Sequence, residues 1–188
     1  ARQRWPALLA QCGLEDAHAI PGEAPRGRAG QQTLFVARAP RRSAAAAAPS
    51  AWTIVADTLG VADALAERLL ARGDAVRVVR PTDMSAADGS RHLVYLAALD
   101  AADVRGAEAL AAVQPLSWLA SHARPGATGR VWLATAGAQP VADFESATAR
   151  WQSPLWGVGR VFALEQPARW GGLVDLSPDE SSGAMASE

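Results

Sequence analysis

The side chains that reductases and many transferases use for chemistry are scarce in this sequence. All 18 basic residues are arginine, so no lysine can form a Schiff base, bind a phosphate or complete a reductase pair. The single tyrosine is Tyr95, and the residue four positions further on is Leu99. The chain alone therefore lacks the Tyr-x-x-x-Lys pair of a conventional short-chain dehydrogenase.

Metal ligands and nucleophiles give no stronger signal. The histidines His18, His92 and His122 have no metal-ligand spacing, Cys12 is the only cysteine, and no Gly-x-Ser-x-Gly elbow occurs. We expect no metal site. One cysteine cannot form an internal disulfide, and no apolar run approaches the ~20 residues of a membrane span. With no signal-peptide core after the first residues, we expect a cytoplasmic location.

Residues 57–62, Asp-Thr-Leu-Gly-Val-Ala, follow an apolar run and would form a strand–helix turn. A dinucleotide-binding turn has three glycines, which let backbone N–H groups approach a pyrophosphate. Here there is one glycine, and Leu59 and Val61 would stand where phosphate oxygens must come close. We expect a structural turn rather than a cofactor loop. Asp57 could bind a ribose hydroxyl, but a cap for the turn is the favoured interpretation.

A second glycine pair, Gly157 and Gly159, follows Pro154 inside an expected helix, which favours close helix packing over phosphate binding. Arg160 beside it could hold an anion or pair with a carboxylate. Trp151, Trp156 and Trp170 cluster near the C-terminal end, where they fit a docking surface or a core equally well. The candidate interface residues are therefore Trp151, Trp156, Arg160 and Trp170.

Short apolar runs alternate with helical patterns from residue 51 onward. Strands are expected over 52–57, 75–80, 92–97, 130–135 and 172–176, and helices from 61 to 72, from 104 to 122 and from Ser153 to Gln166, with Ser153 as N-cap and Pro115 as a kink. This alternation predicts an α/β fold, a truncated Rossmann-like parallel sheet of about five strands with flanking helices. Before it, a helix over 5–11 and a strand over 33–39 are expected.

The chain has 188 residues and a formal net charge of −1. This length fits one domain with a fragment, and the balanced charge favours neither nucleic acid nor membrane as a partner.

Residues 154–167 (Pro-Leu-Trp-Gly-Val-Gly-Arg-Val-Phe-Ala-Leu-Glu-Gln-Pro) and 170–176 (Trp-Gly-Gly-Leu-Val-Asp-Leu) resemble the ketoreductase region of modular polyketide synthases. The match is to the structural subdomain, which precedes the catalytic half. Residues 130–138 and 92–100 resemble it too, and the resemblance covers about residues 51–178.

Residues 1–40 are similar to the C-terminal tail of a polyketide synthase C-methyltransferase. The resemblance rests on Trp5, on Leu8 to Leu14 and on residues 32–40. The glycine-rich S-adenosylmethionine motif of that family is absent.

These resemblances imply a methyltransferase-like tail over 1–40, a linker over 41–50, a ketoreductase structural subdomain over 51–178 and a linker over 179–188. They imply a non-catalytic scaffold that binds no cofactor itself. NADPH and S-adenosylmethionine are expected on neighbouring domains. The expected partners are the ketoreductase catalytic subdomain, the methyltransferase and an enoylreductase of the same synthase. The alternative is a segment of an active β-ketoreductase or C-methyltransferase that contributes to a shared site.

Overall fold

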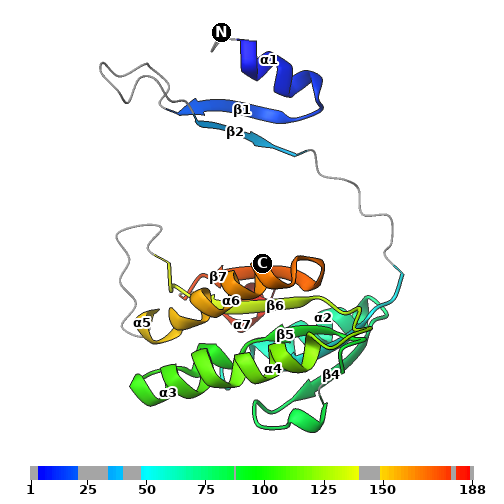
Figure 1. Ribbon diagram of the computed structural model, residues 1–188, viewed down its shortest axis with the longest axis vertical. Coiled ribbons are helices and arrows are strands. Elements are labelled where there is room, and N and C mark those ends of the chain that lie inside the picture. Colours follow the sequence, from blue (N-terminus) through cyan, green and yellow to red (C-terminus); the bar gives the residue numbers. More distant parts are fainter. Residues whose placement is uncertain are drawn as a thin grey trace. The chain divides into compact units, whose positions relative to one another are not determined.

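The computed structural model describes residues 4–20, 34–39, 48–86, 88–139, 149–178 and 181–186. The chain divides into two compact units, Ala1–Ala47 and Ala48–Glu188 (Figure 1).

The first unit contains one helix and a two-stranded antiparallel sheet. These are α1 (Arg4–Gln11), β1 (Glu15–Ile20) and β2 (Leu34–Arg38). The sequence predicts α1 and β2, although Thr33 lies outside the described residues. It does not predict β1, whose run Glu-Asp-Ala-His-Ala-Ile is poor in β-forming residues.

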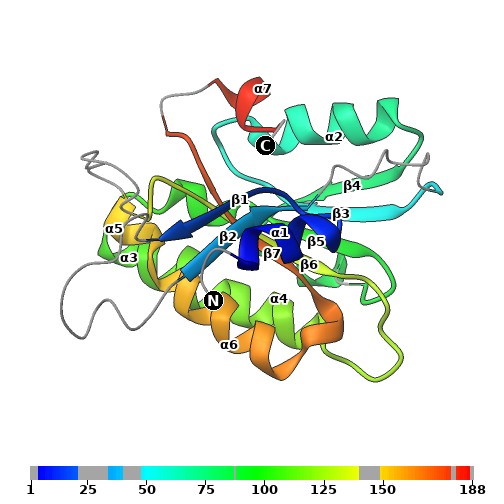
Figure 2. The same ribbon diagram turned by 90° about the horizontal axis from the view of Figure 1, so that it is seen from above.

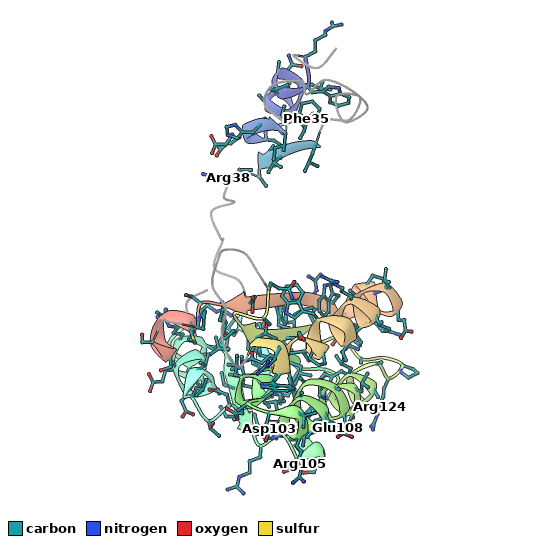
Figure 3. All side chains as sticks on the ribbon, turned by 90° about the vertical axis from the view of Figure 1, so that its left-hand side faces the viewer. Phe35, Arg38, Asp103, Arg105, Glu108 and Arg124 are labelled. Carbon is teal, nitrogen blue, oxygen red and sulfur yellow. The ribbon has the colours of Figure 1, made fainter. Side chains whose placement is uncertain are left out.

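Little of this first unit is shielded from solvent. Trp5 of α1 lies 5.9 Å from Phe35 between ring centroids, and Arg38 pairs with Asp16 at 3.2 Å. Figure 3 labels Phe35 and Arg38. No residue of α1, β1 or β2 is buried, so the described residues of this unit form no buried core of their own.

The second unit is built on a five-stranded sheet in the order β4-β3-β5-β6-β7. The strands are β3 (Ala51–Val55), β4 (Ala75–Val79), β5 (His92–Tyr95), β6 (Val131–Ala136) and β7 (Trp170–Leu176), and every neighbouring pair is parallel. The predicted fold class is therefore confirmed. The strand order reverses between β3 and β5, and open α/β sheets bind ligands at the carboxyl ends of the strands at such a point.

Helices cover both faces of this sheet (Figure 2). α2 (Val61–Ala71) and α7 (Ser182–Met185) lie on one face, and α4 (Gln114–His122) and α6 (Pro154–Glu165) lie on the other. α3 (Val104–Glu108) and a π-helical turn η4 (Ala109–Val113) lead into α4, and α5 (Ala149–Gln152) precedes α6. Short 3₁₀ turns complete the unit: η2 (Met84–Ala86), η3 (Ala97–Asp100) and η5 (Pro167–Arg169).

Alternation along the strands divides the core into two layers. In β5, Leu93 and Tyr95 belong to the layer that contains Trp118 and Phe162, whereas Val94 packs in the layer of α2. Successive strand residues point to opposite faces, so one short apolar strand supplies both layers.

The ion pair between Arg72 and Asp74 fastens the turn between α2 and β4. The Asp74 carboxylate accepts a hydrogen bond of 2.7 Å from the Ser50 backbone N–H and lies 2.6 Å from Arg72. The Ser50 hydrogen bond, helped by Arg72, holds the pKa of Asp74 below its usual value despite the burial of its side chain.

Three local predictions differ from the structure. Ser153 occupies the N-cap position of α6 with Pro154 as the first helical residue, as predicted, but its side chain makes no cap hydrogen bond, because its backbone is helical and its hydroxyl donates to Arg150 O. Pro115 produces no separate break, since the chain widens into the π-helical turn η4 just before it. The polar tail after residue 176 contains α7, whose Met185 is buried, and residues 179, 180, 187 and 188 lie outside the described residues.

Among the described residues, no helix is both long and apolar enough to span a membrane.

Candidate functional site

The turn from β3 to α2 lies at the edge of the sheet where a Rossmann-like fold binds a nucleotide. There the Asp57 carboxylate accepts hydrogen bonds from the backbone N–H groups of Leu59 at 2.8 Å, Val61 at 3.1 Å and Ala62 at 2.7 Å. These N–H groups belong to the turn and to the first residues of α2, whose positive end stabilises a carboxylate. Asp57 is therefore the predicted cap, and it occupies donors that a pyrophosphate would use.

A second carboxylate accepts hydrogen bonds from the same turn and comes from η3, which follows β5. Asp100, at the end of η3, accepts from the Thr58 backbone N–H at 2.9 Å and from the Thr58 hydroxyl at 2.7 Å. Gly60 completes the turn with a φ of 86°, a left-handed conformation that favours glycine. The single glycine of this turn thus serves the backbone geometry.

Tyr95, the single tyrosine, is fully buried at the end of β5. Its hydroxyl donates to Leu110 O in the π-helical turn at 2.8 Å. Burial, followed by the charge of Asp100, raises the pKa of Tyr95 far above its usual value. Tyr95 therefore fastens η4 to the sheet and is not presented to a substrate.

A hydrogen-bond network joins the carboxyl ends of β6 and β7. Asp175 accepts from the Thr135 hydroxyl at 2.7 Å and from the backbone N–H groups of Ala138 at 2.9 Å and Gln139 at 2.8 Å. The indole N–H of Trp156 donates to the Thr135 hydroxyl oxygen at 2.9 Å. Asp175 therefore holds the chain leaving β6, and Trp156 anchors the beginning of α6 to it.

The four candidate interface residues do not form one surface. Trp156 and Arg160 are neighbours on α6, with the guanidinium carbon 5.7 Å from the centre of the indole. Trp170 lies at the start of β7, where its ring is 6.2 Å from that of Phe162 and packs against the core. Trp151, on α5, contacts the guanidinium of Arg150 at 4.8 Å. Trp156 and Trp170 are thus at opposite ends of β6 and α6.

The two glycines of α6 have different surroundings. A Cβ added at Gly159 would lie 2.5 Å from Leu173 Cδ1, so this glycine lets α6 approach the sheet closely, as predicted. A Cβ at Gly157 would meet nothing within 4 Å. Gly157 therefore faces outward and has no packing role within this unit.

Four exposed apolar side chains on η4, α4 and α6 were not predicted from the sequence. Val113 on η4, Leu116 on α4, and Val161 and Leu164 on α6 are 54%, 55%, 53% and 83% exposed, and we call this set the aliphatic face. The buried residues of α4, such as Trp118 and Leu119, point to the sheet, so the aliphatic face points away from it.

The signal for this face was present in the sequence. No charged residue occurs between Glu108 and Arg124, although that stretch forms a surface helix. The charged side chains labelled in Figure 3, among them Asp103, Glu108 and Arg124, lie before or after the stretch. Surface helices ordinarily carry charge on their solvent side, so a charge-free outer side is unusual for such a helix.

In the part of the chain that the structure describes, no three or more His, Cys, Asp or Glu side chains come together in a group that could bind a metal ion. His122 is fully buried, with Nδ1 3.0 Å from Trp118 O. Burial lowers the pKa of His122, which favours its neutral form at the base of α4.

Comparison with known proteins gives a consistent result. The chain matches no family model. It is 43% identical over 60 residues to the pikromycin polyketide synthase component PikAII of Streptomyces venezuelae, which is 32% of this chain and 2% of that protein. It is 41% identical over 68 residues to the erythronolide synthase EryA3 of Saccharopolyspora erythraea, 35% of this chain and 2% of that protein.

Solved structures similar to the chain are polyketide synthase ketoreductases. A C2-type ketoreductase from a modular polyketide synthase gives a TM-score of 0.54 at 25% identity, over 72% of this chain and 34% of that one. An A1-type ketoreductase gives 0.56 at 25% identity, over 74% and 33%. The chain is thus similar to a ketoreductase region of polyketide synthases, and it spans a small part of the curated relatives it matches.

Proposed function

We propose that this chain is a non-catalytic scaffold segment of a polyketide synthase, which supports a ketoreductase catalytic subdomain. The observation that carries this proposal is the aliphatic face of η4, α4 and α6. Burying a Val or Leu side chain stabilises an interface by about 1.5–3 kcal/mol. Four such side chains on neighbouring helices form the apolar centre of a protein interface.

The absence of catalysis is supported by the side chains at the nucleotide edge. Asp57 and Asp100 occupy backbone donors that a dinucleotide phosphate would need. Tyr95 is buried, and the sequence has no lysine. The cofactor, NADPH, would then bind to the neighbouring catalytic subdomain.

For residues 1–40 we propose the C-terminal tail of a C-methyltransferase. β1 and β2 leave one sheet face open, where Ile20, Leu34 and Val36 are 51%, 62% and 49% exposed. A hairpin of this kind is marginally stable alone, and the rest of a methyltransferase domain would cover that face.

Docking is tested with Leu164→Glu in the full chain. A ketoreductase catalytic half from the same synthase is titrated against each variant by calorimetry. Leu70→Glu is the matched control, because Leu70 is also an exposed helical leucine, at 56%, but lies on α2 across the sheet. We expect Leu164→Glu to weaken binding at least tenfold and Leu70→Glu to leave it unchanged. Equal affinity of both variants for the catalytic half would show that the aliphatic face does not bind it and would contradict the proposal.

Catalytic inactivity is tested by titrating the full chain with NADPH. We expect no heat of binding at micromolar concentrations. Saturable micromolar binding would instead support the alternative, a segment of an active reductase. That alternative also predicts that Asp57 or Arg160 substitutions alter turnover of the assembled reductase without altering stability.

A further inference from the structure

An apolar groove opens on the side of the sheet opposite the aliphatic face. Its volume is about 270 Å³, and its floor and walls come from α2, α7 and four strands of the sheet. The groove is bounded by Leu65 on α2, by Trp52, Trp132 and Val174 on the sheet, and by Met185 and Ala186 at α7. α2 and α7 lie together on this face (Figure 2).

The groove has an ordered frame. The indoles of Trp52 and Trp132 lie 5.2 Å apart between ring centres, and His92 contacts both, at 4.7 Å and 5.4 Å. Trp132 rests against the backbone of Gly171, where a Cβ would come within 2.3 Å of the indole. At the other end, Arg68 donates to Gly183 O at 2.9 Å and ties α7 to α2.

We propose that this groove is a binding site for a small uncharged molecule with an aromatic or alkyl body. Every described side chain that lines the groove is apolar or an indole, so none of these residues supplies a cation to neutralise an acid or a carboxylate to bind an amine. An uncharged ligand loses least on entering such a site.

The size of the groove limits the occupant. Engineered apolar cavities of roughly 150 Å³ bind benzene, and drug-sized sites begin near 300 Å³. A groove of about 270 Å³ therefore takes one or two fused or linked rings, or a chain of similar bulk, and is too small for a helix of a partner protein. The proposal is independent of the scaffold role, because the groove and the aliphatic face lie on opposite sides of the sheet.

The test uses two fluorescent probes with the same ring system and different charge. N-phenyl-1-naphthylamine is uncharged, and 1-anilinonaphthalene-8-sulfonate carries a sulfonate. The full chain is titrated with each probe, and the increase in emission gives the dissociation constant. We expect saturable binding of the uncharged probe below 100 µM and at least tenfold weaker binding of the sulfonate. No saturable binding of the uncharged probe, or equal affinity for both probes, would overturn the proposal.

Two variants on the same helix locate the site. Leu65→Trp places a larger side chain in the groove, whereas Leu70→Trp makes the same change at an exposed position of α2 outside it. We expect at least a tenfold loss of affinity for Leu65→Trp and less than a twofold change for Leu70→Trp. Equal affinities would indicate surface adsorption and contradict the assignment. If thermal unfolding shows that Leu65→Trp does not fold, Ala186→Phe fills the groove from α7 and carries the same expectation.

Discussion

Replacing Asp57 by alanine measures how strongly the β3–α2 turn depends on its own carboxylate. The substitution removes hydrogen bonds of 2.8, 3.1 and 2.7 Å to three backbone N–H groups. Two of these groups belong to Val61 and Ala62, which are 2% and 1% exposed, so water replaces the carboxylate poorly there. Removing an N-cap costs about 0.5–2 kcal/mol, and a hydrogen bond to a charged group contributes about 1.5–3 kcal/mol. We expect Asp57→Ala to lower the free energy of unfolding by about 2–3 kcal/mol.

Asp63→Ala is the matched control for Asp57→Ala. Asp63 is an exposed carboxylate in the first turn of the same helix, so its removal changes the charge near the N-terminus of α2 equally. Asp63→Ala loses the favourable interaction of the carboxylate with the helix dipole, but the better helix propensity of alanine offsets part of this loss. We expect the free energy of unfolding to change by no more than about 0.5 kcal/mol. The assay is urea unfolding followed by far-ultraviolet circular dichroism, with the slope m compared between variants. Equal losses of stability in the two variants would refute the reasoning, because charge alone would then explain the effect.

Three further changes test the packing and the electrostatics of the second unit. Gly171→Ala should lower the free energy of unfolding by about 1–3 kcal/mol, because the added Cβ would lie 2.3 Å from the Trp132 ring. Gly172→Ala is the control, because its Cβ would lie 3.5 Å from the same ring, and it should be neutral or stabilising. Chemical denaturation compares the two variants. Tyr95→Phe should cost about 1–2 kcal/mol and should increase hydrogen exchange in the π-helical turn, because one buried carbonyl loses its donor; unchanged exchange would contradict that role. Asp74 has a pKa below its ordinary 3.8 in the folded chain, so the stability that its carboxylate contributes is present above that pH and disappears as the pH falls below it. The difference in free energy of unfolding between the wild type and Asp74→Asn, measured by urea unfolding, should therefore shrink from pH 6 to pH 3. A difference that stays constant with pH would exclude this linkage.

The sheet was predictable from the sequence because each strand is a short apolar run bounded by turn residues. Ile54, Val94 and Leu133 are almost completely buried members of such runs, and parallel strands covered on both faces need apolar residues at nearly every position. β1 could not be predicted, because its pairing with β2 depends on a distant segment and its own composition opposes a strand. α7 could not be predicted either. It depends on the burial of Met185 and on a tether to Arg68, and four residues give no hydrophobic period.

At the candidate site, single residues were predicted better than the surface they form. The cap role of Asp57 follows from local geometry, since the backbone N–H groups that donate to its carboxylate are within five residues of it. The size of the tryptophans fitted a docking surface and a core equally well. In the structure, Trp170 packs against the core, and the indole N–H of Trp156 donates to the Thr135 hydroxyl oxygen. The exposed side of α4 was the more informative feature, because a surface helix ordinarily carries charge at its solvent-facing positions and α4 contains no Asp, Glu, Lys or Arg.

The charges around the β3–α2 turn explain why adding glycines to this turn would not by itself create a phosphate-binding site. Asp57 and Asp100 both place carboxylates around Thr58, and among the described residues neither is in an ion pair. A phosphate about 5 Å from one such charge would be repelled by about 3 kcal/mol at an effective dielectric constant of 20, before screening by salt. Two carboxylates together would offset much of the attraction that the N-terminus of α2 offers to an anion. The turn thus satisfies its own backbone donors with the Asp57 carboxylate, which agrees with the proposed scaffold role.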